Sequence, residues 1–309
     1  MSQNMEGYSL CLEDGNNWRI ICDEYNMPIV DKLANIMRLK ESKSNDIPKL
    51  IYSRIKEDGA LMDNAILTPY STLKDESWKC HNAKSKSLRL WRHPFIDDVL
   101  CEVANENEDN FRYTVLCYSL LAIYNRSIGL GGLPFHAGLA ELNGQGVLFS
   151  ASGGTGKSTT CRRLPDYWKP LCDDETLVVL DSNKEYRAHP FPTWSDYLMK
   201  RASNTWDVQY SVPVSAIFFL ERADNDEVTR LTASEASVLM MESASQVCVH
   251  TKTLYRQQPD LAEFRKKLFN NACNLAIYIN LKKPSLIESS RAKKLIEPLP
   301  LLVSISRLR

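Results

Sequence analysis

The chain has 309 residues, 44% of them hydrophobic and 25% charged, a globular composition that excludes a disordered, collagen-like or coiled-coil chain. The 38 basic residues balance 38 acidic ones, and this zero net charge argues against general binding to nucleic acid or to a membrane surface. The length is typical of about two domains.

The first residues and the cysteines indicate the compartment. The start carries neither a basic nor an apolar segment of the secretory type, and no apolar run reaches the length of a membrane span. Nine cysteines, no two of them closer than 11 residues, exclude CxxC metal and redox motifs. We expect a cytoplasmic protein with reduced, mostly buried thiols.

The first third of the chain predicts a small domain of mixed secondary structure, over residues 1–110. Alternation over 8–22, interrupted by polar residues at 14–17, indicates a hairpin, and apolar residues at helical spacing follow over 28–39. The stretch 79–92 has five basic residues and no acidic one. It is either a docking surface for an acidic partner or a solvated strand or loop.

The remaining residues, 111–309, predict a second domain. A buried helix is expected over 111–124, and a hairpin over 139–149 with the turn Asn143-Gly144. Beyond it the pattern predicts, in chain order, strands at 176–180, near Tyr186 and at 216–220, and helices at 234–247 and 260–272. We expect an α/β fold with α+β character.

The segment that follows the hairpin fits most of the phosphate-binding pattern G-x-x-x-x-G-K-[ST]. Gly156, Lys157 and Ser158 match, while Ala151 replaces the first glycine. An apolar strand precedes the loop and a helix can follow, so backbone N–H groups can converge on phosphate oxygens. Lys157 would neutralise phosphate charge, and the Ser158 hydroxyl would ligate Mg²⁺. We expect ATP to be bound by Ser152, Gly153, Gly154, Thr155, Gly156, Lys157, Ser158 and Thr159.

Two adjacent carboxylates, Asp173 and Asp174, follow Lys157 by 16 and 17 residues. Only a short helix fits in the gap, so we expect the pair near the phosphates. Adjacent carboxylates raise each other's pKa, so one can act as a base while the other serves the metal. The alternative is an acidic turn before a strand. His136 stands among apolar neighbours, and its position alone favours a buried core histidine.

The order of these features resembles bacterial HPr kinase/phosphorylase, over roughly residues 130–250. That family has a histidine, then a GxSGxGKS loop, then an aspartate pair; here His136, ASGGTGKST at 151–159 and Asp173-Asp174 stand in that order. A closer resemblance is to the HPr-kinase-like proteins of peptide-modification cassettes, such as the SynChlorMet cassette and lasso-peptide kinases. The segments that carry it include GGLPFHAGLAELNGQGVLFSASGGTGKSTTCRRL at 131–164, LCDDETLVVL at 171–180 and YRAHPFPTWSDY at 186–197.

The resemblance implies a P-loop core of the HPr kinase and phosphoenolpyruvate carboxykinase type, in a family that is often oligomeric. It implies that Asp173 deprotonates the acceptor hydroxyl, with His136 beside this aspartate, and that Asp174 joins Ser158 as a metal ligand. The family's glycine-rich signature after the aspartates is absent. In that region Arg187 is a candidate phosphate clamp and Glu185 a candidate helper of the metal, each with a surface strand position as the alternative.

We therefore expect a Mg²⁺-dependent and ATP-dependent kinase that acts on a Ser/Thr hydroxyl of a peptide or small protein, such as a ribosomally made precursor peptide. Residues 1–110 would recognise the peptide, because a phosphate loop carries no peptide specificity. Two alternatives stay open. One is a nucleotide-gated module that binds a peptide without transfer, and the other is a small-metabolite kinase on the same core.

Overall fold

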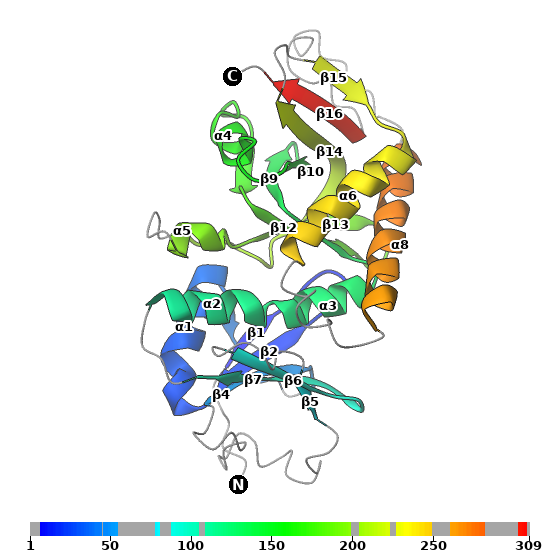
Figure 1. The fold of residues 1–309 in the computed structure, drawn as a ribbon. Helices are drawn as coiled ribbons and strands as arrows, with labels where there is room; N and C mark the ends of the chain where they lie inside the picture. Colours follow the sequence, from blue (N-terminus) through cyan, green and yellow to red (C-terminus); the bar gives the residue numbers. More distant parts are fainter. Residues whose placement is uncertain are drawn as a thin grey trace. The chain divides into compact units, whose positions relative to one another are not determined.

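The computed structural model describes residues 7–44, 46–54, 78–80, 88–104, 109–198, 204–222, 227–248, 260–281 and 302–307 (Figure 1). They form two mixed sheets with helices, so the expected α/β class is confirmed. The chain divides into two compact units. The first is built from segments within Met1–Arg126 and Trp194–Gln209, and the second from segments within Ser127–Thr193, Tyr210–Val249 and Pro259–Arg309.

The described strands of the first unit form a sheet in the order β3-β1-β2-β4-β7-β6-β5. They are β1 (Tyr8–Leu10), β2 (Trp18–Cys22), β3 (Lys40–Glu41), β4 (Lys49–Arg54), β5 (Lys79–Cys80), β6 (Leu88–His93) and β7 (Ile96–Val103). The central strands β2, β4 and β7 are parallel, and their register sets Ile21 beside Ile51 and Ile51 beside Leu100. This apolar row packs with Trp78 in the core of the unit.

Of the two helices predicted for this part of the chain, the one over 28–39 is confirmed as α1 (Met27–Met37). The other described helices that lie in the first unit, wholly or for most of their length, are η1 (Glu24–Asn26), α2 (Asp109–Ser119), α3 (Leu121–Gly129) and α5 (Trp194–Leu198). The single helix predicted over 111–124 is wrong, because α2 and α3 are separate helices. The Ser119 hydroxyl donates to the Leu116 carbonyl (2.7 Å) and accepts from the Tyr52 hydroxyl (2.5 Å). Such side-chain bonding to the backbone competes with regular helix.

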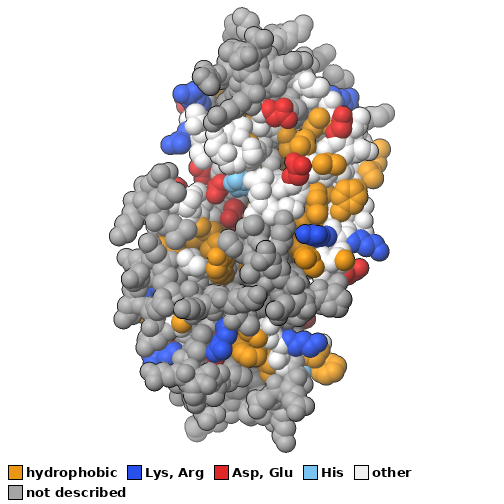
Figure 2. All heavy atoms as spheres, in the orientation of Figure 1, with side chains coloured by type: hydrophobic (Ala, Val, Ile, Leu, Met, Phe, Trp, Pro, Cys, Tyr) orange, Lys and Arg blue, Asp and Glu red, His pale blue; other side chains and the backbone are white. Residues whose placement is uncertain are grey.

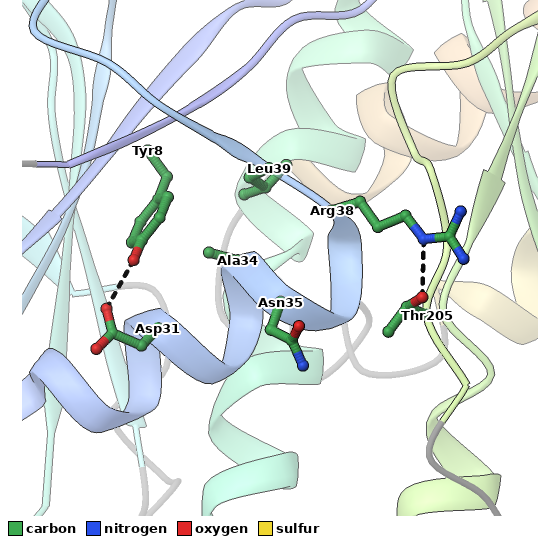
Figure 3. A pocket seen from close by; sticks show the side chains of 7 residues that line it. All are labelled: Tyr8, Asp31, Ala34, Asn35, Arg38, Leu39 and Thr205. Carbon is green, nitrogen blue, oxygen red and sulfur yellow. Dashed lines mark hydrogen bonds between the residues drawn. The ribbon is translucent and has the colours of Figure 1, made fainter.

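Helix α1 ends where a distant segment of the chain docks on it. The backbone N–H of Trp206 donates to the Ile36 carbonyl (2.8 Å), and Arg38 Nε donates to the Thr205 hydroxyl (2.8 Å). A pocket of about 490 Å³ lies at this place, and the Tyr8 hydroxyl is bonded to Asp31 at its other end (2.9 Å; Figure 3). Residues 204–209 therefore belong to the first unit although strands of the second unit precede and follow them.

The predicted basic stretch 79–92 is strand at both described ends, β5 and β6; residues 81–87 lie outside the described residues. Arg89 Nε lies 2.8 Å from the carboxylate of the buried Glu102. In the part of the chain that the structure describes, no helix is both long and apolar enough to cross a membrane.

The second unit contains a larger sheet in the order β11-β9-β10-β14-β13-β12-β8, which β15 and β16 extend beside β14. Its strands are β8 (Leu133–Phe135), β9 (Ala137–Leu142), β10 (Gln145–Ser150), β11 (Lys169–Cys172), β12 (Glu175–Leu180), β13 (Tyr186–Phe191), β14 (Val212–Arg222), β15 (Glu227–Arg230) and β16 (Leu302–Arg307). The predicted hairpin is confirmed as β9 and β10. Its turn residues Asn143 (φ 51°) and Gly144 (φ 75°) both have the positive φ that a tight hairpin turn requires.

Three described helices complete the second unit: α4 (Lys157–Arg162), α6 (Ala233–Val247) and α8 (Asp260–Leu281). The predicted helices at 234–247 and 260–272 are confirmed, and the second one continues to Leu281. A capping box begins α6, because Thr232 Oγ1 accepts from Glu235 N–H (3.3 Å) and Glu235 Oε2 accepts from Thr232 N–H (2.8 Å). Helices α6 and α8 lie side by side, and apolar side chains gather on their outer faces (Figures 1 and 2).

A close approach of β9 and α4 gives a test of this packing. A Cβ atom on Gly138 would overlap the Cys161 sulfur and lie 3.4 Å from the Cα atom of Asp173. Gly138→Ala should therefore lower the free energy of unfolding by about 1–3 kcal/mol, as overpacking usually does. Removing the sulfur as well, in Gly138→Ala/Cys161→Ala, should give a smaller loss than the sum of the single variants. Urea denaturation measures all four proteins, and additive losses would contradict the contact.

Candidate functional site

The phosphate-loop sequence lies between β10 and α4. Gly154 (φ 77°) and Gly156 (φ 112°) adopt left-handed conformations that residues with a side chain rarely take. At Gly153, Gly154 and Gly156, no described protein atom lies within 4 Å of the position that a Cβ would occupy. One side of the loop backbone is thus open to a group that approaches it closely, as phosphate binding requires.

The base of the loop is anchored in the core. Ala151, which replaces the first glycine of the pattern, is buried with Phe149, Cys161 and Trp168 in one hydrophobic cluster. Burial raises the pKa of the Cys161 thiol to about 12, so this side chain packs as a neutral group. Ala151 therefore packs in the hydrophobic core, and the loop positions with open space around them begin at the glycines that follow it.

Lys157, the first residue of α4, turns its side chain inward, and only 6% of the residue is exposed. Its Nζ lies 3.2 Å from the Ala151 carbonyl, 2.8 Å from His136 Nε2 and 3.9 Å from Asp174 Oδ1. Burial lowers the pKa of Lys157, and this effect exceeds the opposing influence of the two aspartates.

Strand pairing brings His136 and the aspartates together. His136 is the one residue between β8 and β9, and Asp173 and Asp174 are the two residues between β11 and β12. Because β11 pairs with β9 and β12 pairs with β8, the two short connections lie opposite each other. The register places Cys172 beside Leu139 on one side of them and Thr176 beside Phe135 on the other.

The two aspartates have different partners. His136 Nε2 lies 3.0 Å from Asp174 Oδ1, whereas the buried Thr193 hydroxyl donates to Asp173 Oδ1 (2.6 Å). Burial raises the pKa of Asp174, but the hydrogen bond and charge of His136, together with Lys157, outweigh it, so the pKa lies below its usual value. The resemblance implied that His136 lies beside Asp173, and the structure corrects this, because the ring contacts Asp174.

Three further residues of the site carry no signal in the sequence that would have singled them out. Thr193 follows β13, and Ser243 and Gln246 stand in the last turns of α6. Ser243 Oγ accepts from the His136 N–H (3.1 Å), and Gln246 Oε1 contacts the ring at Nδ1. A helical pattern predicts α6 but does not identify which of its faces meets the loop.

Arg187 and Glu185 lie away from the loop. The Arg187 guanidinium bonds to the hydroxyl (2.8 Å) and carbonyl (3.0 Å) of Ser211, which precedes β14. The phosphate loop follows the end of β10, which pairs in parallel with β14. Ser150 at that end stands beside Phe219, roughly 25 Å along the strand direction from Ser211. Glu185 is in the turn that joins β12 to β13, at the far end of β12 from Asp174. Arg187 is thus a residue of strand β13, which was the alternative for it, whereas Glu185 lies in the turn before that strand.

The donors near the loop suit a hard cation that is shared with phosphate. Among the described residues no three His, Cys, Asp or Glu side chains are close enough to hold a metal by themselves. Mg²⁺ in nucleotide sites uses one or two carboxylates and relies on phosphate and water for the rest. The half-buried Ser158 in the first turn of α4 and the Asp174 carboxylate provide such a set.

The burial of Lys157 predicts a gain in stability when its charge is removed. Lys157→Met should raise the free energy of unfolding of the free protein by roughly 1 kcal/mol, because an apolar side chain needs no compensation when buried. The unfolded chain keeps the lysine proton as the pH rises through the lowered folded pKa, so wild-type stability increases with pH. The advantage of the variant should therefore shrink toward alkaline pH.

Thermal unfolding from neutral to alkaline pH measures this effect. Lys169→Met is the control, since Lys169 is exposed and its hydrogen bond to Glu141 raises its pKa instead. A Lys157→Met protein less stable than the wild type at neutral pH would show that the partners of Lys157 compensate its burial fully.

A known family model matches the part of the chain that contains the site. Residues 99–283 match the family model described as SynChlorMet cassette protein ScmC, and no curated protein sequence matches the chain. The matched segment includes His136, the loop and both aspartates, and it covers more than half of the 309 residues. The chain belongs to the ScmC family of SynChlorMet cassette proteins.

Proposed function

We propose that the chain is an ATP-dependent kinase that phosphorylates a Ser or Thr hydroxyl of a peptide or small protein. The observation that carries this proposal is the buried Lys157 ammonium, which faces His136 and Asp174 directly beside an open glycine loop. The order of these motifs along the chain supports a core of the HPr kinase type, to which the resemblance of the sequence pointed.

Nucleotide binding would rest on the loop and on Lys157. The N–H groups of residues 152–157 would face the phosphates, and the open positions at Gly153, Gly154 and Gly156 leave room for them. Helix α4 has six residues, so its end adds little to the attraction. Lys157 would turn from the Ala151 carbonyl toward the β- and γ-phosphates, where its charge is neutralised.

Mg²⁺ held by Ser158, Asp174 and phosphate oxygens would neutralise the charge that develops on the β- and γ-phosphates. The low pKa of Asp174 keeps its carboxylate ionised for that role. His136 competes for the same oxygen, Oδ1, at 3.0 Å, so the ring must release Asp174 in part or share it.

Asp173 is the candidate base for the acceptor hydroxyl. Thr193 binds its Oδ1, which fixes the carboxylate and leaves Oδ2 without a hydrogen bond to the described residues. The acceptor oxygen would form a bond to the γ-phosphorus as the bond from that phosphorus to the β-bridging oxygen breaks. The hydroxyl proton would pass to Asp173, and ADP would leave.

A peptide acceptor is proposed because the sequence resembles the HPr-kinase-like proteins of peptide-modification cassettes, and we assign its recognition to the first unit. The decisive assay is incubation of the purified protein with ATP, Mg²⁺ and the peptides encoded beside its gene, with intact mass as the readout. A gain of one phosphoryl group on a peptide is the expected result. Nucleotide-dependent retention of a peptide without a gain in mass would favour a binding module, and a phosphorylated metabolite would favour a small-metabolite kinase.

The role of Asp173 predicts a separation of binding from transfer. Asp173→Asn should keep the ATP affinity and lower the transfer rate by about 10²-fold or more, the usual effect of losing a general base. Glu185→Gln is the matched control, because this exposed carboxylate stands in the turn after β12. Near-normal transfer by Asp173→Asn would remove Asp173 from the role of base.

The role of Lys157 predicts a loss in the binding step itself. Isothermal calorimetry of Lys157→Met with ATP and Mg²⁺ should show an affinity at least about 10-fold lower, since a charge-assisted contact to phosphate is removed. The same protein should remain folded, because the substitution relieves a buried charge. An unchanged ATP affinity would contradict the assignment of the loop.

A further inference from the structure

We propose that Gln246 is a positioning residue for His136: its amide oxygen keeps a ring proton on Nδ1 and so presents the other nitrogen, Nε2, as an acceptor to Lys157. The inference deepens the proposed function, and its kinetic part rests on that function. Its structural part concerns only the ring and stands by itself.

The last turns of α6 hold His136 at two points. Ser243 and Gln246 are three residues apart and therefore share one face of the helix. The buried Ser243 hydroxyl accepts from the backbone N–H of His136 (3.1 Å) and from the Ser150 hydroxyl (2.9 Å). Gln246 reaches the ring of the same residue. One helix face thus fixes both the backbone and the ring of His136 between β8 and β9.

The contact with Gln246 determines where one proton of the ring lies. Gln246 Oε1 can only accept, so Nδ1 must carry the proton that it meets. In a neutral ring Nε2 then has a free lone pair, which accepts from the Lys157 ammonium at 2.8 Å. The other groups near the ring are Lys157 from α4, whose Nζ is closer to Nε2 (2.8 Å) than to Nδ1 (3.4 Å), and Asp174 from the β11–β12 connection, 3.0 Å from Nε2.

The opposite tautomer would change both partners of Nε2. Nε2 carries a proton in the Nε2–H tautomer and also in the doubly protonated ring. In both forms it donates to Asp174 Oδ1, 3.0 Å away, which is the contact that lowers the pKa of that carboxyl, and Lys157 loses an acceptor. Asp174 would then be bound to the ring instead of being available to a cation. By holding the proton on Nδ1, Gln246 favours the state in which Lys157 is held beside the loop and Asp174 is not committed to the ring as an acceptor.

The ring proton can be read directly from the free protein, without nucleotide or metal. ¹⁵N-histidine spectra recorded in alkaline buffer distinguish the Nδ1–H from the Nε2–H tautomer. The His136 signals are assigned by their loss in His136→Gln. The variants are Gln246→Leu, which has no acceptor, and Gln246→Glu, whose carboxylate still accepts. Ser245→Ala on the same turn is the control, and Gln246 is exposed, so these variants should fold.

The wild type, Gln246→Glu and Ser245→Ala should show the Nδ1–H form, and Gln246→Leu should shift toward Nε2–H. A wild-type ring with its proton on Nε2, or a tautomer that does not change in Gln246→Leu, would overturn the inference. Either result would also show that the Gln246 amide does not present its oxygen to the ring.

The kinetic readout then separates this inference from the proposed function. Gln246→Leu should lower kcat about 10- to 100-fold, as the loss of a residue that orients a site residue often does, with an unchanged KM for the peptide and rescue by Gln246→Glu. If the wild type transfers and Gln246→Leu transfers equally well, the inference fails while the kinase stands. If the wild type phosphorylates nothing but the tautomer shifts as expected, the positioning of His136 stands and the proposed function fails.

Discussion

The second unit is organised around one buried ammonium group. A charge removed from water needs polar partners, and those of Lys157 come from separate parts of the chain: the loop carbonyl of Ala151, the His136 ring and the Asp174 carboxylate. The pairing of β8 with β12 and of β9 with β11 brings the last two together, and Ser243 and Gln246 of α6 hold the backbone and the ring of His136. The polar partners of the Lys157 ammonium are therefore positioned by strand pairing across the sheet and not by the loop alone.

The Lys157 ammonium and the loop beside it lower the stability of the free protein but leave the site open to a charged ligand. Burial disfavours the charged form of Lys157, while the open glycine positions leave the adjacent loop without packing. Phe149, Cys161 and Trp168 offset this by filling the space behind the loop. The site is thus rigid on its core side and accessible on the other, the arrangement expected where a charged ligand replaces internal partners.

The sequence predicted those parts of the site that depend on neighbours in the chain. The Asn143-Gly144 turn and the strand-loop-helix order around Lys157 follow from local spacing, and both are observed. Thr193, Ser243 and Gln246 were not predictable, because their bonds to the site join residues 20, 107 and 110 positions apart. The contact of His136 with Asp174 instead of Asp173 likewise depends on strand register, which a pattern of residue types does not specify.

The path of the chain between the units has a consequence for how the protein can be divided. Thr193, which holds Asp173, is directly followed by α5 and by the segment whose Trp206 and Thr205 dock on α1, before the chain returns at Tyr210 to form β14. No single cut therefore yields two intact halves. A fragment that starts after the first sheet would keep the loop but would expose the surface of residues 204–209 that α1 covers. A gene fusion or a recombination between relatives must therefore keep the two units together, and proteolysis at a single site would not release either unit intact.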